Sequence, residues 1–330
     1  MGKTIMDRAA TSTATANAGK HVETMLRAEL ARGDRALSGV APVLSHMLAS
    51  SGHALVNEDV IARLRGMLTD CGRQLFAAAN AAASSAGPEA EQAAIDNLAE
   101  ELAGNGPVLS HYYALAMEGH LAHRLEHRSS LDPVLSPLLQ ELIASDQDDT
   151  ADIAMSAMAA QSRFIQSQRR MALPVTELPA RLFHMVLESW QTWAGAKGIV
   201  DQGGVQSSTI KFRTEYDEAS TRLGLLTRLT GTMRKGAIAA LELDHAGLAL
   251  FATALATLTR QPRDLAILAC HERQAARLAL GLRAAGLDQQ TIERQFLLLE
   301  PVERLPRQMG EIAPEQAAAL LGQSAAWKGG

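Results

Sequence analysis

One pentapeptide in this chain has the residue types and the spacing of a metal-dependent hydrolase. In "HRLEH", His123 and His127 are four residues apart, and Glu126 directly precedes the second histidine. On a helix, two histidines four apart lie on one face, where they can bind zinc together while the glutamate acts as a general base. The stretch therefore matches the H-x-x-E-H pattern of one class of zinc hydrolase.

The surroundings of this pentapeptide favour a simpler interpretation. Such a site needs a further carboxylate ligand on a partner helix, and the enzymes that use it have a mixed sheet, of which this chain shows no sign. Arg124 and Arg128 also place positive charge beside the metal. A polar helix face, continued by His120, suits the C-terminal half of a helix, where the dipole favours cations. We expect no metal and no cofactor, and we keep the zinc hydrolase as the alternative.

Other motifs point away from an enzyme. Glu242 and His245 have the Glu-x-x-His spacing of di-iron bundles, but a second copy is missing, and Asp244 is the natural N-cap of the helix that follows. The chain has no nucleophile elbow, phosphate-binding loop or dinucleotide fingerprint. Cys71 and Cys270 lie far apart and lack zinc or catalytic spacing. Whether the protein is an enzyme stays open, and a non-enzymatic role is favoured.

A basic row is the candidate binding surface. Arg163, Gln166 and Arg170 are three and seven residues apart, so they share one face of a helix expected at 149–171. Acidic residues at the start of this helix and arginines at its end follow the charge order that the helix dipole prefers, so a solvated face also explains the row. If the row binds anything, the natural partner is an acidic surface of another protein.

Two glutamines lie in the apolar stripe of the same helix. Gln161 and Gln168 align with Ala154, Met158 and Ile165 on a helical wheel. A buried amide must find hydrogen-bond partners. We therefore expect both glutamines to be structural, bonding to neighbouring backbone and determining how this helix docks.

Composition predicts an all-α protein. Aromatic residues make up only 4% of the 330 residues, and alternating runs of β-branched residues are nearly absent. A net charge of −5 gives no general attraction to nucleic acid. The longest apolar run, residues 246–259, is too short to span a bilayer. The start has no secretory signal and the two cysteines fit a reducing compartment, so we expect a cytoplasmic protein.

Breakers divide the chain into helical hairpins. We expect a flexible tail at 1–19, a helical-repeat domain at 20–195, a linker at 196–208 and a second helical domain at 209–330. A further linker-like stretch covers 80–88. Many two-helix units in succession are typical of stacked helical hairpins, as in HEAT-like α-solenoids. Seven prolines fit the first position of a helix: Pro42, Pro88, Pro107, Pro137, Pro179, Pro262 and Pro314.

The helices themselves follow from apolar residues that recur every three or four positions. We expect them at 20–31, 42–55, 57–80, 88–103, 107–128, 137–145, 149–171, 179–194, 210–230, 232–243, 245–260, 262–285, 288–299 and 314–322.

An extended string within 131–190 carries a family resemblance. The residues "LDPVLSPLLQELIAS" and "AMAAQSRFIQSQRRMALPVTELPARLFH" resemble a family of alphaproteobacterial helical proteins, domain-of-unknown-function family 2336, and a looser echo follows at 261–287. The resemblance implies a cytoplasmic bacterial protein of paired helices similar to HEAT units, with no agreed activity. Residues 1–130 have no place in the family's pattern.

Taken together, these observations predict a non-enzymatic protein-interaction or regulatory module. Its partner would be another protein, bound through Arg163, Gln166 and Arg170, with no nucleic acid and no membrane involved. The sequence leaves the oligomeric state open.

Overall fold

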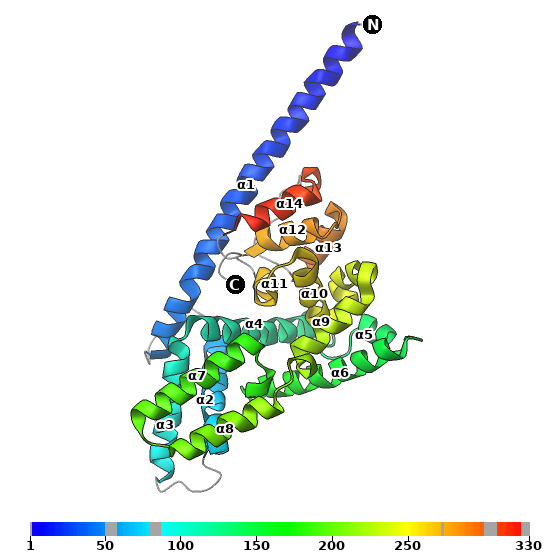
Figure 1. Ribbon diagram of the computed structural model, residues 1–330. Coiled ribbons are helices and arrows are strands. Elements are labelled where there is room, and N and C mark those ends of the chain that lie inside the picture. The colour runs from blue at the N-terminus through cyan, green and yellow to red at the C-terminus, as the bar shows by residue number, and fades with distance from the viewer. Residues whose placement is uncertain (1, 50–57, 80–86, 272–273, 300–308, 325–330) are drawn as a thin grey trace. The chain divides into compact units, whose positions relative to one another are not determined.

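The computed structural model describes residues 2–49, 58–79, 87–271, 274–299 and 309–324 (Figure 1). Every regular element in these ranges is an α-helix or a 3-10 helix, and no strand occurs among them. The prediction of an all-α protein is confirmed. None of the helices in the described ranges is both long and apolar enough to cross a membrane.

The chain forms two compact units. The central unit consists of Val40–Arg234 and His245–Leu250, and the second unit consists of Met1–Gly39, Lys235–Asp244 and Phe251–Gly330. The division does not follow the boundary that we expected at 196–208, because that stretch lies wholly within the central unit.

The central unit contains most of the long helices. Its elements in chain order are α2 (Glu58–Ala79), α3 (Pro88–Gly104), α4 (Gly106–Ser129), α5 (Pro137–Ile143), α6 (Asp148–Arg169), η1 (Val175–Glu177), α7 (Ala180–Lys197), α8 (Gln202–Glu215), η2 (Glu218–Ser220) and α9 (Arg222–Met233). Helices adjacent in sequence pack as hairpins, namely α2 with α3, α3 with α4, α5 with α6 and α7 with α8. Helices distant in sequence also pack, namely α2 with α8, α3 with α7 and α6 with α9. Stacking of successive hairpins therefore accounts for only part of the packing.

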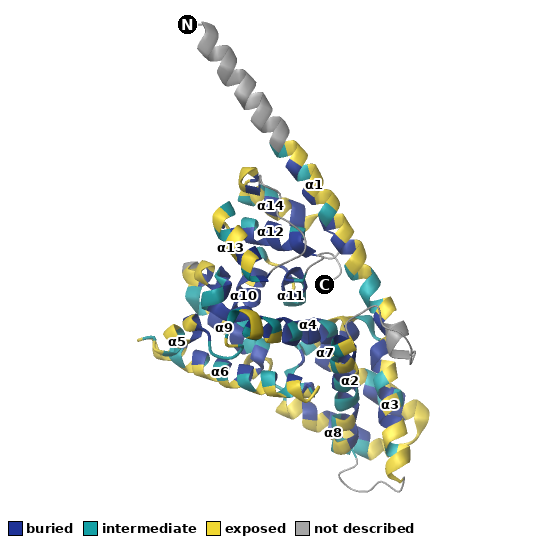
Figure 2. Cartoon of the chain, turned by 180° about the vertical axis from the view of Figure 1, so that it is seen from behind, coloured by how far each residue is buried: buried dark blue, intermediate teal, exposed yellow. Residues whose placement is uncertain are grey.

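The core of the central unit follows α4. Figure 2 shows buried residues gathered along α4 and on the helices that meet it. At one end, the rings of Phe76 and Trp190 lie 5.1 Å apart and those of Phe76 and Trp193 lie 5.5 Å apart. Each buried indole N–H has a partner, since Trp190 donates to Ser208 and Trp193 donates to Asn97. Large aromatic area with satisfied polar atoms is a strong source of stability for a helix cluster.

The second unit is formed by α1 up to Gly39 and by the C-terminal helices. Its further elements are η3 (Arg234–Leu241), α10 (Leu243–Thr259), α11 (Arg263–Ala269), α12 (Ala275–Ala284), α13 (Gln289–Leu299), η5 (Met309–Glu311) and α14 (Pro314–Gly322). Helix α10 is interrupted at Gly247, whose φ of 69° is left-handed, and residues 245–250 belong to the central unit.

A buried ionic network connects three segments of the second unit. The Arg277 guanidinium donates to the Asp34 carboxylate and to the Ser324 hydroxyl, and Ser324 donates to Asp34 over 2.8 Å. Gln274 donates to the backbone oxygen of Gly33. Burial lowers the pKa of Arg277, and the Asp34 carboxylate opposes that shift. The network joins the first helix of the chain to residues near its C-terminal end.

Several predicted boundaries are wrong. Residues 2–19, expected to be a flexible tail, are part of α1 (Gly2–Ala49), because a stretch rich in alanine also favours helix. The two helices expected at 20–31 and 42–55 are joined within α1 as far as Ala49, and Pro42 lies inside that helix rather than at its start. By contrast, four prolines do occupy the first turn of a helix: Pro88, Pro107, Pro137 and Pro314. Most of the linker expected at 80–88 lies outside the described residues.

The linker predicted at 196–208 is largely helical. Helix α8 begins at Gln202, with the Asp201 side chain accepting a hydrogen bond from Gly204 N–H. A Cβ on Gly204 would lie 2.6 Å from the backbone oxygen of Ala79. Glycine at this position therefore allows α8 to approach α2 closely.

The long helix predicted at 210–230 is two helices. The chain leaves α8 at Tyr216, whose hydroxyl donates to the backbone oxygen of Leu178 over 2.9 Å. Helix α9 then starts after Thr221, whose side chain accepts the N–H of Gly224. The break places Arg222 at the first position of α9, which is important for the site described below.

The close contact at Gly204 predicts a destabilising effect of a single methyl group. Gly204→Ala forces α8 away from α2, and we expect the free energy of unfolding to fall by about 1–3 kcal/mol. Gly231→Ala is the matched control, because a Cβ at that position has no heavy atom within 4 Å and alanine should stabilise the helix by roughly 0.5–1 kcal/mol. Urea unfolding followed by circular dichroism measures both. A Gly204→Ala protein as stable as the natural one would contradict the α2–α8 packing.

Candidate partner-binding pocket

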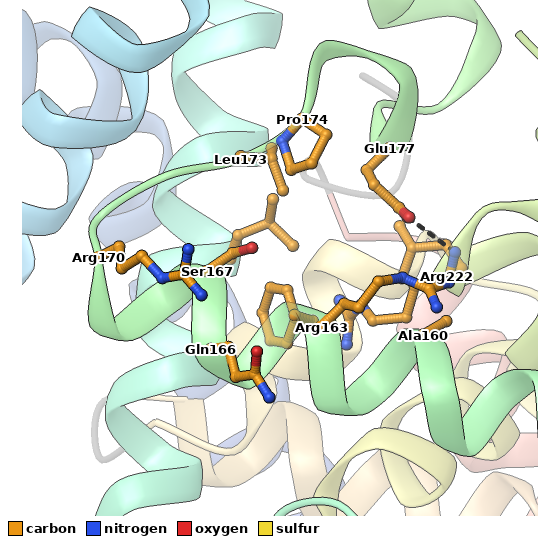
Figure 3. Close-up of a pocket in the computed structure, with 12 residues that line it drawn as sticks. Ala160, Arg163, Gln166, Ser167, Arg170, Leu173, Pro174, Glu177 and Arg222 are labelled. Atoms are coloured by element: carbon orange, nitrogen blue, oxygen red, sulfur yellow. Dashed lines mark hydrogen bonds between the residues drawn. The ribbon is translucent and has the colours of Figure 1, made fainter. Parts of the chain in front are cut away.

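A pocket of about 170 Å³ lies beside α6 in the central unit. We call it the α6 pocket. Its apolar lining comes from α4, α6, the segment after α6 and the start of α9: Leu115, Ala160, Phe164, Leu173, Pro174 and Leu223. Its polar lining is contributed by α6, η1 and α9: Arg163, Gln166, Ser167, Arg170, Glu177 and Arg222. Figure 3 shows both sets around the hollow.

The basic row predicted from the sequence lines this pocket. Arg163, Gln166 and Arg170 are all exposed and all contribute to the lining. Within the described residues, no side-chain hydrogen bond or ion pair engages these three groups. The row is therefore a set of free donors at the edge of an apolar hollow. The sequence indicated the row and did not indicate the hollow.

A third arginine in the pocket is buried and engaged in hydrogen bonds. The guanidinium of Arg222 donates from Nη1 and Nη2 to the two carboxylate oxygens of Glu118, at 2.8 and 3.0 Å. Nη1 also donates to Gln161 over 3.0 Å, and the group lies 3.6 Å from the centre of the Phe164 ring. The backbone N–H of Arg222 donates to Glu177 over 2.8 Å. Both charged side chains are at most 3% exposed, so their pairing is a requirement of the fold.

The two predicted structural glutamines lie where α6 meets its neighbours. Gln161 is buried, donating from its amide to the backbone oxygen of Pro133 over 2.8 Å and accepting from Arg222. Gln168 is also buried, and its amide donates to the thioether of Met67 over 3.2 Å. The side-chain oxygen of Gln168, Oε1, has no hydrogen-bond partner in the described part of the chain. Gln161 thus contacts both neighbouring backbone and the buried ion pair.

Helix α2 holds the segment that forms one wall of the pocket. Asp70 accepts the N–H of Leu173, and Gln74 both donates to the Leu173 oxygen and accepts the N–H of Val175, at 2.8 to 3.2 Å. These side chains provide hydrogen-bond partners for the backbone N–H and C=O groups of an irregular segment, as a neighbouring strand would in a sheet. The close approach depends on Gly66, where a Cβ would lie 2.5 Å from Cβ of Met171.

A charged pair extends this contact to the end of α6. Arg63 donates from Nη1 to the backbone oxygen of Gln168 over 3.1 Å and from Nε to Asp59 over 2.9 Å. The hydrogen bond from Arg63 holds the pKa of Asp59 below its ordinary value, against the opposing effect of burial. Asp59 therefore stays ionised and keeps Arg63 directed at the backbone just before Arg170.

Sequence reasoning missed Asp70, Gln74, Glu118 and Arg222. For Glu118 a signal was present, because a single acidic residue stands in the apolar stretch "YYALAMEGHLA" and a charge in a buried helix needs a partner. For the others, nothing local distinguishes them from ordinary surface residues.

The histidine stretch forms no enclosed site. His123 and His127 are exposed on α4, and their Nε2 atoms lie 3.0 Å apart, while Nδ1 of His120 is 3.7 Å from Asp59. Within the described ranges, no group of three or more His, Cys, Asp or Glu side chains could hold a metal. The two histidines can provide a metal with two ligands. Glu126, beside them in sequence, is half-buried.

Two further candidates for chemistry have structural roles. His245 lies 3.0 Å from Glu141, while Asp244 pairs with Arg294 over 2.6 Å and is not the N-cap of α10, a position that Glu242 occupies. Burial raises the pKa of the Cys71 thiol to about 12, so it stays protonated at neutral pH and is no nucleophile.

Comparisons of the chain with models of protein families, with curated proteins and with solved structures find no match. The resemblance to family 2336 stays an expectation.

The buried pair beneath the pocket predicts a strong and non-additive stability effect. Arg222→Met leaves the Glu118 carboxylate buried without its cation, and Glu118→Met leaves the Arg222 guanidinium buried without its anion. Each change should therefore lower the free energy of unfolding by about 3–5 kcal/mol. The double variant removes both charges and should be more stable than either single variant. Urea unfolding of all four proteins gives the coupling energy. A cost below about 1 kcal/mol for the single variants would contradict the described pairing.

Proposed function

We propose that this protein is a non-enzymatic interaction module that binds an acidic segment of another protein at the α6 pocket. One observation carries the proposal. The three residues of the basic row, Arg163, Gln166 and Arg170, line one hollow and have free donor groups above an apolar lining.

The charges of the pocket favour an anionic partner. The cation of Arg222 is neutralised by Glu118, and the Glu177 carboxylate accepts the Arg222 backbone N–H. Glu177 keeps its negative charge, so the net positive charge of the lining comes from the two exposed cations, Arg163 and Arg170. A guanidinium binds a carboxylate through two parallel hydrogen bonds, which adds geometric specificity to charge attraction. Carboxylates beside apolar groups are the ligand chemistry that matches this lining.

The remaining expectations belong to the same proposal. Paired helices similar to HEAT units would provide a long surface on which such a pocket is one contact, and a cytoplasmic location in a bacterial cell fits the free, buried state of Cys71 and Cys270. The alternative, a zinc hydrolase at His123, Glu126 and His127, has less support, because no third ligand stands near these residues in the described part of the chain.

The metal alternative has its own test. Protein purified without an affinity tag should contain far less than one zinc or iron per chain by elemental analysis. His123→Ala with His127→Ala should leave the unfolding midpoint unchanged, because both rings are exposed. Stoichiometric metal that disappears in the double variant would favour the hydrolase.

The proposed function predicts that acidic peptides bind and that the basic row is required. A displayed library of random 12-residue peptides is selected on the immobilised full chain. We expect enrichment of Asp and Glu next to large apolar residues, with binding that weakens as salt is added. For the selected peptides, Arg163→Glu with Arg170→Glu should raise Kd about tenfold or more, since two attractive contacts become repulsive.

Arg169→Glu is the matched control for that variant. Arg169 is exposed on the same helix and does not line the pocket, so this single charge reversal, half the charge change of the double variant, should alter Kd less than twofold. Selected peptides without acidic residues, or equal binding to the double variant, would contradict the proposal.

A further inference from the structure

We infer that the α6 pocket receives one large apolar side chain of the acidic segment, of the size of Leu, Met or Phe, between carboxylates held by Arg163 and Arg170. The inference rests on the proposed function and specifies the recognition element of the partner.

The volume of the pocket sets the size of its occupant. At about 170 Å³ it is close to an apolar cavity of about 150 Å³ in another protein that takes up benzene. Pockets for cofactors and drug-sized ligands are larger, at roughly 300–1,000 Å³. One phenyl or branched aliphatic group fills the α6 pocket, and a nucleotide or flavin does not fit.

The lining selects an apolar occupant. Leu115, Ala160 and Phe164 are buried and form part of the lining, with Leu223 on the side of α9. The buried polar group here, the Arg222 guanidinium, already bonds to Glu118 and Gln161, so it does not call for a polar ligand. An apolar side chain placed in the hollow therefore loses water without leaving this buried guanidinium unsatisfied.

The walls of the pocket are formed before anything binds. The segment at Leu173 is held by Asp70 and Gln74, and the start of α9 is held by Glu118 through Arg222. Binding to a preformed pocket avoids the cost of ordering its walls. This arrangement is typical of an anchor pocket, where one buried side chain contributes most of the binding energy.

The mouth of the pocket sets the spacing of the acidic residues. Arg163 on α6 and Arg170, the C-cap residue directly after this helix, are seven residues apart, which at 1.5 Å per residue is about 10 Å along the helix. Figure 3 shows Gln166 and Ser167 between them, at the edge of the hollow. In a polyproline II peptide, residues three apart lie on the same side and are separated by about 9 Å. We therefore expect two acidic residues three positions apart with the apolar anchor between them.

Three labelled peptides test the anchor separately from the charges. They are "GSEAFEGS", a version with alanine in place of phenylalanine, and a version with glutamine in place of both glutamates, titrated with the full chain by fluorescence anisotropy. We expect the alanine version to bind at least tenfold more weakly than the parent, and the glutamine version likewise. Equal binding of the alanine version would overturn the anchor while leaving the acidic partner in place. Failure of all three peptides and of the selected peptides would overturn the proposed function as well.

Filling the pocket is the second test. Ser167→Phe places a ring in the hollow from α6, and Leu223→Trp does so from α9, so a folding failure of one variant leaves the other informative. Both should abolish binding of the parent peptide and of fluorobenzene, observed by ¹⁹F NMR. Fluorobenzene should still bind to Arg163→Glu with Arg170→Glu, because that variant changes only the edge.

Ser156→Phe is the matched control for the filled variants. Ser156 is exposed on the same helix and is not part of the pocket lining, so the same substitution should leave both ligands bound. Unchanged peptide and fluorobenzene binding in folded Ser167→Phe and Leu223→Trp proteins would overturn the inference.

Discussion

The central unit depends on the buried pair between Arg222 and Glu118. Two full charges that are at most 3% exposed are stable only when each has complete hydrogen-bond partners, and here both oxygens of Glu118 accept from Arg222. Because Gln161 and Phe164 complete the contact from α6, the pair determines the register of three helices, α4, α6 and α9, at one point. Two members of this contact, Phe164 and Arg222, also line the α6 pocket.

Arginine performs two different tasks at this pocket, and the two differ in burial. Arg222 is enclosed, neutralised and structural, whereas Arg163 and Arg170 are exposed and without side-chain partners among the described residues. Solvent separates the tasks, since a free cation is tolerable only where water can reach it. The polar contacts that support the pocket, from Asp70, Gln74 and Arg63, all bond to backbone atoms and leave the edge arginines free.

The sequence predicts the features that depend on neighbouring residues, and it does not predict those that depend on contacts between distant segments. Periodicity and first-turn prolines predicted α2 through α7 closely, and they predicted that Arg163, Gln166 and Arg170 share a face. The division of 210–230 was missed because it depends on Tyr216 bonding to Leu178, which is 38 residues away in sequence. Gly204 was misread as a linker residue because its role is a contact with Ala79 on another helix. The partner of Glu118 lies 104 residues away, and a hollow made by four segments has no signature in any one of them.

The groups that line the pocket supply the chemistry that the proposed recognition requires. At the α6 pocket, Glu177 accepts a backbone N–H, Arg222 is neutralised, and the remaining polar groups are guanidinium, amide and hydroxyl donors. Such donors bind carboxylates well. An apolar hollow with an exposed cationic edge is thus suited to the partner that we propose.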